Sequence, residues 1–202
     1  MFDLITGWIQ TGGLAMVGLL MVLENVFPPI PSELIVPLAG YEAAQGSFSL
    51  IALLIVATLG SLLGTLIWYG LARAWGHDRF LRFVDRWGPW LTLSPEEADR
   101  AMDWFARHGR AAVFFGRLVP TVRTLISVPA GLSGMNPLAF LLFTAAGSFL
   151  WIVILAGAGY LLRENYDRVE QWLNPLSTLV VILILGTYLY RLVTGLWRRG
   201  RR

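Results

Sequence analysis

The 202-residue sequence contains no cysteine and no lysine, so all 16 of its basic residues are arginine. Without cysteine, neither a disulfide framework nor thiolate metal chemistry is possible. Without lysine, Schiff-base catalysis and P-loop phosphate binding are excluded. Charged residues are also scarce at 14%, whereas hydrophobic residues reach 56%, a balance too apolar for an ordinary soluble domain. The composition therefore predicts a single membrane-embedded bundle.

The sequence gives no support for nucleic-acid binding, a signal peptide or a metal site. The pI near 9.7 could suggest nucleic acid, but the arginines flank apolar runs, so membrane topology explains them and no nucleic-acid partner is expected. The start, Met1-Phe2-Asp3, has no basic region and does not resemble a signal peptide. His77 and His108 lie beside basic segments without a third ligand at metal spacing, so we expect no metal and no cofactor.

One polar stretch interrupts apolar sequence near the N-terminus. Residues 23–33 contain three prolines within four positions, which block a continuous helix, together with two carboxylates. Broken backbone and charge at membrane depth are tolerated only where they are buried in protein or line water. We therefore expect this stretch to line a cavity. Its polar and proline residues are Glu24, Asn25, Pro28, Pro29, Pro31, Ser32 and Glu33.

A second polar stretch lies about ninety residues further on, at 116–124. Its charged residues are arginines, and its other notable residues are a proline and a threonine: Arg117, Pro120, Thr121 and Arg123. The segments that follow, 33–40 and 123–131, are similar in layout, and each precedes a long apolar run. Repeats of this kind build many transporters. One half carries acids and the other carries arginines.

The remaining elements follow from the apolar runs. We expect one all-α membrane domain over residues 1–202, an inverted-repeat, transporter-like bundle of two opposed re-entrant hairpins and about three transmembrane helices. Within this domain, a short interfacial helix over 2–11 precedes the first hairpin. The elements are a first hairpin at 12–45, a span at 49–72, an amphipathic cytoplasmic segment at 73–109, a second hairpin at 110–135, spans at 138–162 and 175–197, and a basic tail at 198–202.

The side of the membrane on which the N-terminus lies stays open at this stage. Residues 12–28 can instead form a first full span ending near Pro28, which would place the N-terminus on the cytoplasmic side. Arginine in the segment 73–110 and in the tail favours a cytoplasmic C-terminus.

Ser94-Pro95-Glu96-Glu97 has the features of a helix start, and that helix should end near His108. Glu42 is expected to be a solvated surface acid.

The four central charges suggest a binding chemistry. Arginine holds phosphate bidentately and stays charged, so Arg117 and Arg123 are the candidate headgroup-binding residues. Burial raises the pKa of a carboxyl group, so Glu24 and Glu33 are the candidates for proton exchange. The alternative is structural: the same acids pair with the arginines only to let the hairpins fold in lipid. Asn25, Ser32 and the prolines would support the hairpin tips.

These residues resemble the DedA family, also called the VTT or SNARE-associated domain family. The resemblance covers residues 10–165 and rests on two motifs, Glu24-Asn25-x-x-Pro28-Pro29-x-Pro31-Ser32-Glu33 and Phe115-Gly116-Arg117-x-x-Pro120-x-x-Arg123, followed by Pro129-Ala130-Gly131 and Met135. It implies a bacterial inner-membrane protein with two re-entrant hairpins that moves lipids across the bilayer. It also implies that transport depends on the proton gradient and on the side chains of Glu24, Glu33, Arg117 and Arg123.

The resemblance favours translocation of undecaprenyl phosphate to the cytoplasmic leaflet, with phospholipid flipping or scrambling, for example of phosphatidylethanolamine, as an alternative. A proton-coupled transporter of small solutes is another. The expected partners are an anionic lipid, the bilayer and protons, and a homo-oligomer is left open. A lipid-phosphate phosphatase with a histidine nucleophile is not favoured, since both histidines lie outside the two motifs.

Overall fold

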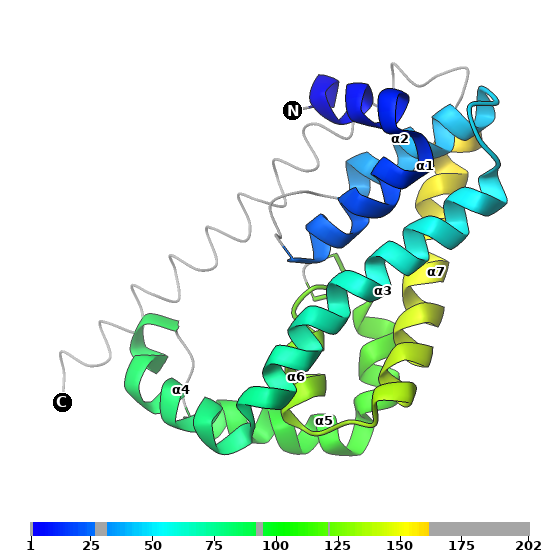
Figure 1. The fold of residues 1–202 in the computed structure, drawn as a ribbon. Coiled ribbons are helices and arrows are strands. Elements are labelled where there is room, and N and C mark those ends of the chain that lie inside the picture. The colour runs from blue at the N-terminus through cyan, green and yellow to red at the C-terminus, as the bar shows by residue number, and fades with distance from the viewer. Residues whose placement is uncertain (1, 27–31, 92–94, 121, 162–202) are drawn as a thin grey trace.

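The computed structural model describes residues 2–26, 32–91, 95–120 and 122–161, and every regular element in these ranges is a helix (Figure 1). This confirms the all-α prediction. The helices are α1 (Phe2–Val26), α2 (Ser32–Ala44), α3 (Leu50–Trp75), α4 (His77–Leu91), α5 (Pro95–Gly116), α6 (Ser127–Leu132) and α7 (Pro137–Leu161).

Helix α1 consists of two arms that meet at a kink. Gly13 has φ 55° and ψ −144°, a backbone conformation that residues with a Cβ rarely adopt. Figure 1 shows the first arm lying across one end of the molecule and the second arm turning away from it. The second arm, residues 14–26, is roughly 20 Å long, shorter than the apolar thickness of a bilayer. Ile5–Val26 qualifies as a candidate span by length and composition, but only across this kink.

Helices α3 and α7 are long enough to cross a membrane, with 26 and 25 residues, or roughly 39 and 37 Å. They confirm the helices predicted at 49–72 and 138–162. The predicted span at 175–197 and the basic tail lie outside the described residues. Large apolar side chains are exposed along both helices, as lipid contact requires. They include Ile51, Ile55, Leu59, Leu63, Ile67, Leu138, Leu142, Phe149, Leu150 and Ile154.

Helices α3 and α7 each pack against helices from both halves of the chain. Helix α3 contacts α1 and α6, and α7 contacts α5 and α2. Glycines permit these approaches: a Cβ at Gly60 would collide with the backbone of Gly18, and one at Gly159 with the backbone of Pro37. Small residues at such crossings are typical of helix packing in membranes.

Helix α5 is longer than predicted. It was expected to end near His108, but it continues without interruption to Gly116. Residues 110–115 include two alanines, which favour helix, and no proline occurs between Pro95 and Pro120. The predicted division of the chain between 109 and 110 is therefore not a helix boundary.

Glu42, expected at the surface, is 8% exposed, so that expectation was wrong. One carboxylate oxygen accepts a hydrogen bond of 3.0 Å from Gln10 Nε2, and the other accepts one of 2.9 Å from Ser47 Oγ. These bonds satisfy the buried carboxylate. They also tie the first arm of α1 to the end of α2.

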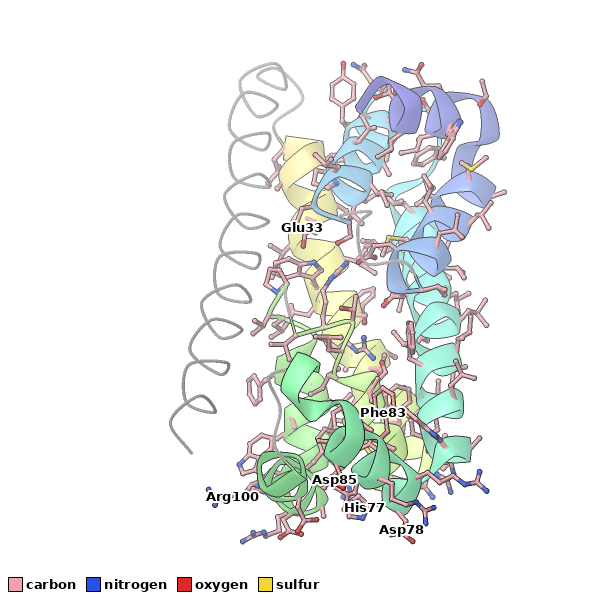
Figure 2. All side chains as sticks on the ribbon, turned by 90° about the vertical axis from the view of Figure 1, so that its left-hand side faces the viewer. Glu33, His77, Asp78, Phe83, Asp85 and Arg100 are labelled. Carbon is pink, nitrogen blue, oxygen red and sulfur yellow. The ribbon has the colours of Figure 1, made fainter. Side chains whose placement is uncertain are left out.

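Helix α4 and the first half of α5 form a charged end of the molecule, opposite the first arm of α1 (Figure 1). His77 Nε2 lies 3.5 Å from Asp99 Oδ1 and links the two helices. Figure 2 shows His77, Asp78, Asp85 and Arg100 gathered there, whereas Glu33 lies well away from them along the bundle.

Candidate functional site

A buried ion pair joins the two polar stretches predicted from the sequence. Glu24 lies in the last turn of α1 and is 2% exposed, and Arg123 lies in the turns between α5 and α6 and is 7% exposed. Nη2 of Arg123 contacts Oε1 of Glu24 directly. Removing two charges from water is costly unless they compensate each other, so this contact holds the first polar stretch against the second.

Arg117 completes the group from the position directly after α5. Its guanidinium is buried, donating from Nη1 to the backbone oxygen of Arg123 and from Nη2 to Ser127 Oγ at 2.8 Å. The group also lies 5.9 Å from the ring centroid of Phe140, within the range of a cation–π contact. Its Nε is buried without a hydrogen-bond partner. One donor of a fixed cation is therefore left for another acceptor.

A chain of polar contacts extends from this group through three helices. Asn25 donates from Nδ2 to the oxygen of Met21 at 2.9 Å and to Ser61 Oγ at 3.3 Å. Ser61 Oγ in turn lies 3.5 Å from Ser148 Oγ. Trp68 Nε1 donates to the backbone oxygen of Asn25 at 3.0 Å. Asn25, next to Glu24, is thus tied to α3, and Ser61 of α3 is in turn linked to Ser148 of α7.

Other predicted site residues are not joined to this centre. Glu33, in the first turn of α2, forms no ion pair with a described residue, so only three of the four predicted charges meet. Ser32 is fully buried, and its Oγ has no hydrogen-bond partner. Pro120 lies in an exposed turn. The predictions for Pro28, Pro29, Pro31 and Thr121 fall outside the described residues.

Buried hydroxyl groups near the centre were not among the predicted site residues. They include Ser127, which contacts Arg117, and Ser61 and Ser148, which contact each other. Thr144 is also fully buried on α7, and its Oγ1 has no partner. The available signal was the presence of hydroxyls within apolar runs, because lipid offers such groups no partner.

The histidines lie apart from the arginines of the centre. His77 pairs with Asp99, and His108 Nδ1 lies 3.2 Å from the backbone oxygen of Trp104. Within the described part of the chain, no three histidine, aspartate or glutamate side chains are grouped so that they could hold a metal ion.

The geometry can be compared with known proteins. The family model described as the VTT domain matches residues 30–161. The chain belongs to the VTT domain, or DedA, family. Residues of both polar stretches fall within the match, including Glu33, Arg117 and Arg123, while Glu24 precedes it. No solved structure matches this member of the family at a significant level.

Relatives with different kinds of name match this VTT domain protein. Undecaprenyl phosphate transporter A of Staphylococcus aureus is 34% identical over 201 residues, covering 100% of this chain and 99% of its own. A protein of the same name from Bacillus subtilis is 27% identical and covers 95% of both chains. An alkaline phosphatase-like protein of Lactococcus lactis is 39% identical over 86% of this chain and 84% of its own. The chain is thus similar to bacterial membrane proteins over essentially its whole length.

Proposed function

We propose that this VTT domain protein moves undecaprenyl phosphate across the bacterial inner membrane and returns it to the cytoplasmic leaflet. The observation that carries the proposal is the arginine centre: Arg117 has a buried, unpartnered Nε beside the buried pair of Glu24 and Arg123. The names of the relatives from Staphylococcus aureus and Bacillus subtilis support the choice of lipid.

The chemistry of the centre suits a phosphate group. Two arginines meet at this centre, because Arg117 donates to the backbone oxygen of Arg123. Guanidinium forks match phosphate oxygens better than any other side chain. The polyprenyl tail is as apolar as the bilayer and can remain in it, so only the headgroup needs a polar route.

The carboxylate gives the site a means of release. Glu24 and a lipid phosphate compete for Arg123, since both are anions that bind its guanidinium. Protonation of Glu24 would free Arg123 for the phosphate, and deprotonation would help to expel it. Glu33 is an acid without an ion-pair partner among the described residues and is the second candidate for proton exchange. Proton coupling is part of this proposal.

The packing suggests how the route is built. We infer that α1 with α2, and α5 with α6, are re-entrant pairs related as an inverted repeat. The support is reciprocal: the first pair packs on α3 and α7, and the second packs on α7 and α3. Supporting roles at the hairpin tips are proposed for Asn25, Pro28, Pro31, Ser32, Pro120 and Thr121. The C-terminus is assigned to the cytoplasm.

Two observations bear on the alternatives. Phospholipids, including phosphatidylethanolamine, present a similar phosphate, but their amine would depend more on the acids than on the arginines. An enzyme is suggested by the name of the Lactococcus lactis relative, yet the contacts given for His77 and His108 do not involve Arg117 or Arg123. We therefore propose a transporter that forms no covalent intermediate.

The test uses liposomes containing the purified full chain and labelled undecaprenyl phosphate in one leaflet. Arg117→Ala should reduce the translocation rate about a hundredfold, because the headgroup loses the charge-assisted hydrogen bond that Nε would donate and the attraction of a buried positive charge. The exposed Arg100→Gln variant removes the same charge at the charged end and should transport normally. Labelled phosphatidylethanolamine is the second lipid.

The choice of lipid, the proton coupling and the absence of enzyme activity would each be contradicted by a different result. Equal transport of both lipids, with unequal dependence on the glutamates, would identify a phospholipid scramblase. Full transport by Glu24→Gln and Glu33→Gln, unaffected by an imposed pH gradient, would remove proton coupling and leave lipid passage intact. Release of inorganic phosphate from the lipid by pure protein would make it an enzyme.

A further inference from the structure

A second group of arginines borders a cavity at the charged end of the molecule. The cavity has a volume of about 600 Å³ and lies between residues 105–111 of α5 and the segment that leads from α6 into α7. Figure 1 shows these two segments side by side at the lower end. Glu24, Arg117 and Arg123 are not among its lining residues. Its size is typical of small-molecule sites.

The formally charged residues of the lining are both arginines. Arg107 and Arg110 border the cavity together with His108, and no acidic residue does. Arg107 uses Nε to donate to the backbone oxygen of Asp103 at 3.2 Å. No ion pair joins Arg107 or Arg110 to a carboxylate of the described residues. The guanidinium groups thus remain available to an anion.

The wall opposite the arginines is held rigidly. The backbone oxygen of Met135 accepts hydrogen bonds from Tyr69 Oη and, at 2.8 Å, from Arg73 Nη1. Asn136 Oδ1 accepts one of 2.9 Å from the backbone nitrogen of Leu138 and so caps α7. A wall fixed in this way costs little to order when a ligand binds.

The rim of the cavity has the character of a membrane interface. Trp104, 52% exposed, stacks on His108 with ring centroids 5.3 Å apart, and Leu138 is 65% exposed on the first turn of α7. Tryptophan near arginine marks the level of lipid headgroups. An anion that reaches this cavity can therefore still be attached to the bilayer.

We propose that this cavity binds the phosphate of an anionic lipid headgroup at the membrane surface. Arg107 and Arg110 hold the phosphate oxygens while the acyl chains stay in the bilayer beside Leu138 and Trp104. This binding does not depend on translocation through the centre. Free inorganic phosphate presents the same oxygens, so the experiment must distinguish the two sources.

The test measures binding of fluorescent phosphatidic acid to the full-length protein in detergent, with phosphatidylcholine as the uncharged comparison. Arg107→Gln with Arg110→Gln should weaken the binding of phosphatidic acid about tenfold or more. Arg79→Gln with Arg82→Gln removes equal charge from α4 outside the cavity and should change it less than about twofold. Thermal unfolding midpoints verify that both double variants fold.

Repeating the measurement in the Arg117→Ala background separates this site from the centre, because the loss should persist there. Failure of transport by Arg117→Ala bears on the proposed function alone. Wild-type binding by the Arg107/Arg110 variant, or an equal loss in the α4 variant, would overturn the proposal. Displacement of the lipid by millimolar inorganic phosphate would show that the cavity selects free phosphate, and would overturn the lipid assignment.

Discussion

The first polar unit, α1 with α2, and the second, α5 with α6, present opposite charges on different kinds of backbone. Glu24 sits on regular helix in the last turn of α1, whereas Arg117 and Arg123 sit in turns between α5 and α6. A carboxylate only accepts hydrogen bonds, but a guanidinium donates five. Most backbone oxygens of a helix already accept an intrahelical hydrogen bond, so irregular backbone offers a buried arginine additional acceptors. The oxygen of Arg123 that receives Arg117 is such an acceptor.

The sharpest test of this comparison is to remove one member of the ion pair. Arg123→Ala leaves Glu24 buried without its counterion, and we expect a loss of about 3–5 kcal/mol in unfolding free energy, together with loss of transport. The measurement is denaturant unfolding in detergent micelles.

The control is the pair of neutral substitutions made together. Glu24→Gln with Arg123→Gln removes both charges and should recover most of the stability without restoring transport. Arg117 has no carboxylate partner among the described residues, so Arg117→Ala should cost less than Arg123→Ala. Equal costs for the two arginines would mean that the Glu24 contact contributes nothing special to folding.

The second test addresses the helix crossing between α2 of the first unit and α7. A side chain at Gly159 would strike the backbone of Pro37, whereas Gly157, two residues earlier on α7, has nothing within 4 Å. Gly159→Val should therefore destabilise the protein by about 3 kcal/mol through overpacking, and Gly157→Val should not. Thermal unfolding of the two variants in the same detergent makes the comparison, and similar midpoints would show that α2 is not packed this closely on α7.

The sequence predicted the broad design because charges within apolar runs are rare and therefore informative. It placed α3 and α7 within a few residues, and it selected Glu24, Arg117 and Arg123, which the structure brings together. The long, uninterrupted runs behind these predictions have few alternative structures in a membrane.

The sequence could not say which acid pairs with which arginine. Glu24 and Glu33 are nine positions apart, and a proline-rich segment between them leaves their relative direction undefined. The partner of Arg117, Ser127, was equally hidden, because its selection depends on how the turns fold. The sequence divided the span from the amphipathic segment between 72 and 73, whereas α3 continues to Trp75 and ends at Gly76, whose φ is 79°.

A third, smaller difference in unfolding free energy is expected between substitutions of the buried serines of the two units, Ser127 and Ser32. Ser127→Ala removes the acceptor at 2.8 Å from Arg117 Nη2 and should cost about 1.5 kcal/mol, as expected for a hydrogen bond to a charged group. Ser32 is equally buried but has no partner, so Ser32→Ala should be neutral or slightly stabilising. Unfolding free energies decide this. A transport defect in Ser32→Ala at unchanged stability would instead make its hydroxyl a substrate contact.

The smallest effect concerns the way each unit is tied at its outer end. Gln10 and Ser47 hold Glu42 in the first unit, while Tyr69 and Arg73 both donate to the oxygen of Met135 in the second. Tyr69→Phe keeps the ring that stacks on Phe140. It removes the hydroxyl that accepts from Arg73 Nη1 at 2.6 Å, but Arg73 can still donate to Met135, so we expect a loss of about 1 kcal/mol. A loss above about 2 kcal/mol in detergent unfolding would mean that Arg73 cannot hold Met135 alone. The attachment of Met135 to α3 would then depend on the hydroxyl of Tyr69 rather than on either of two donors.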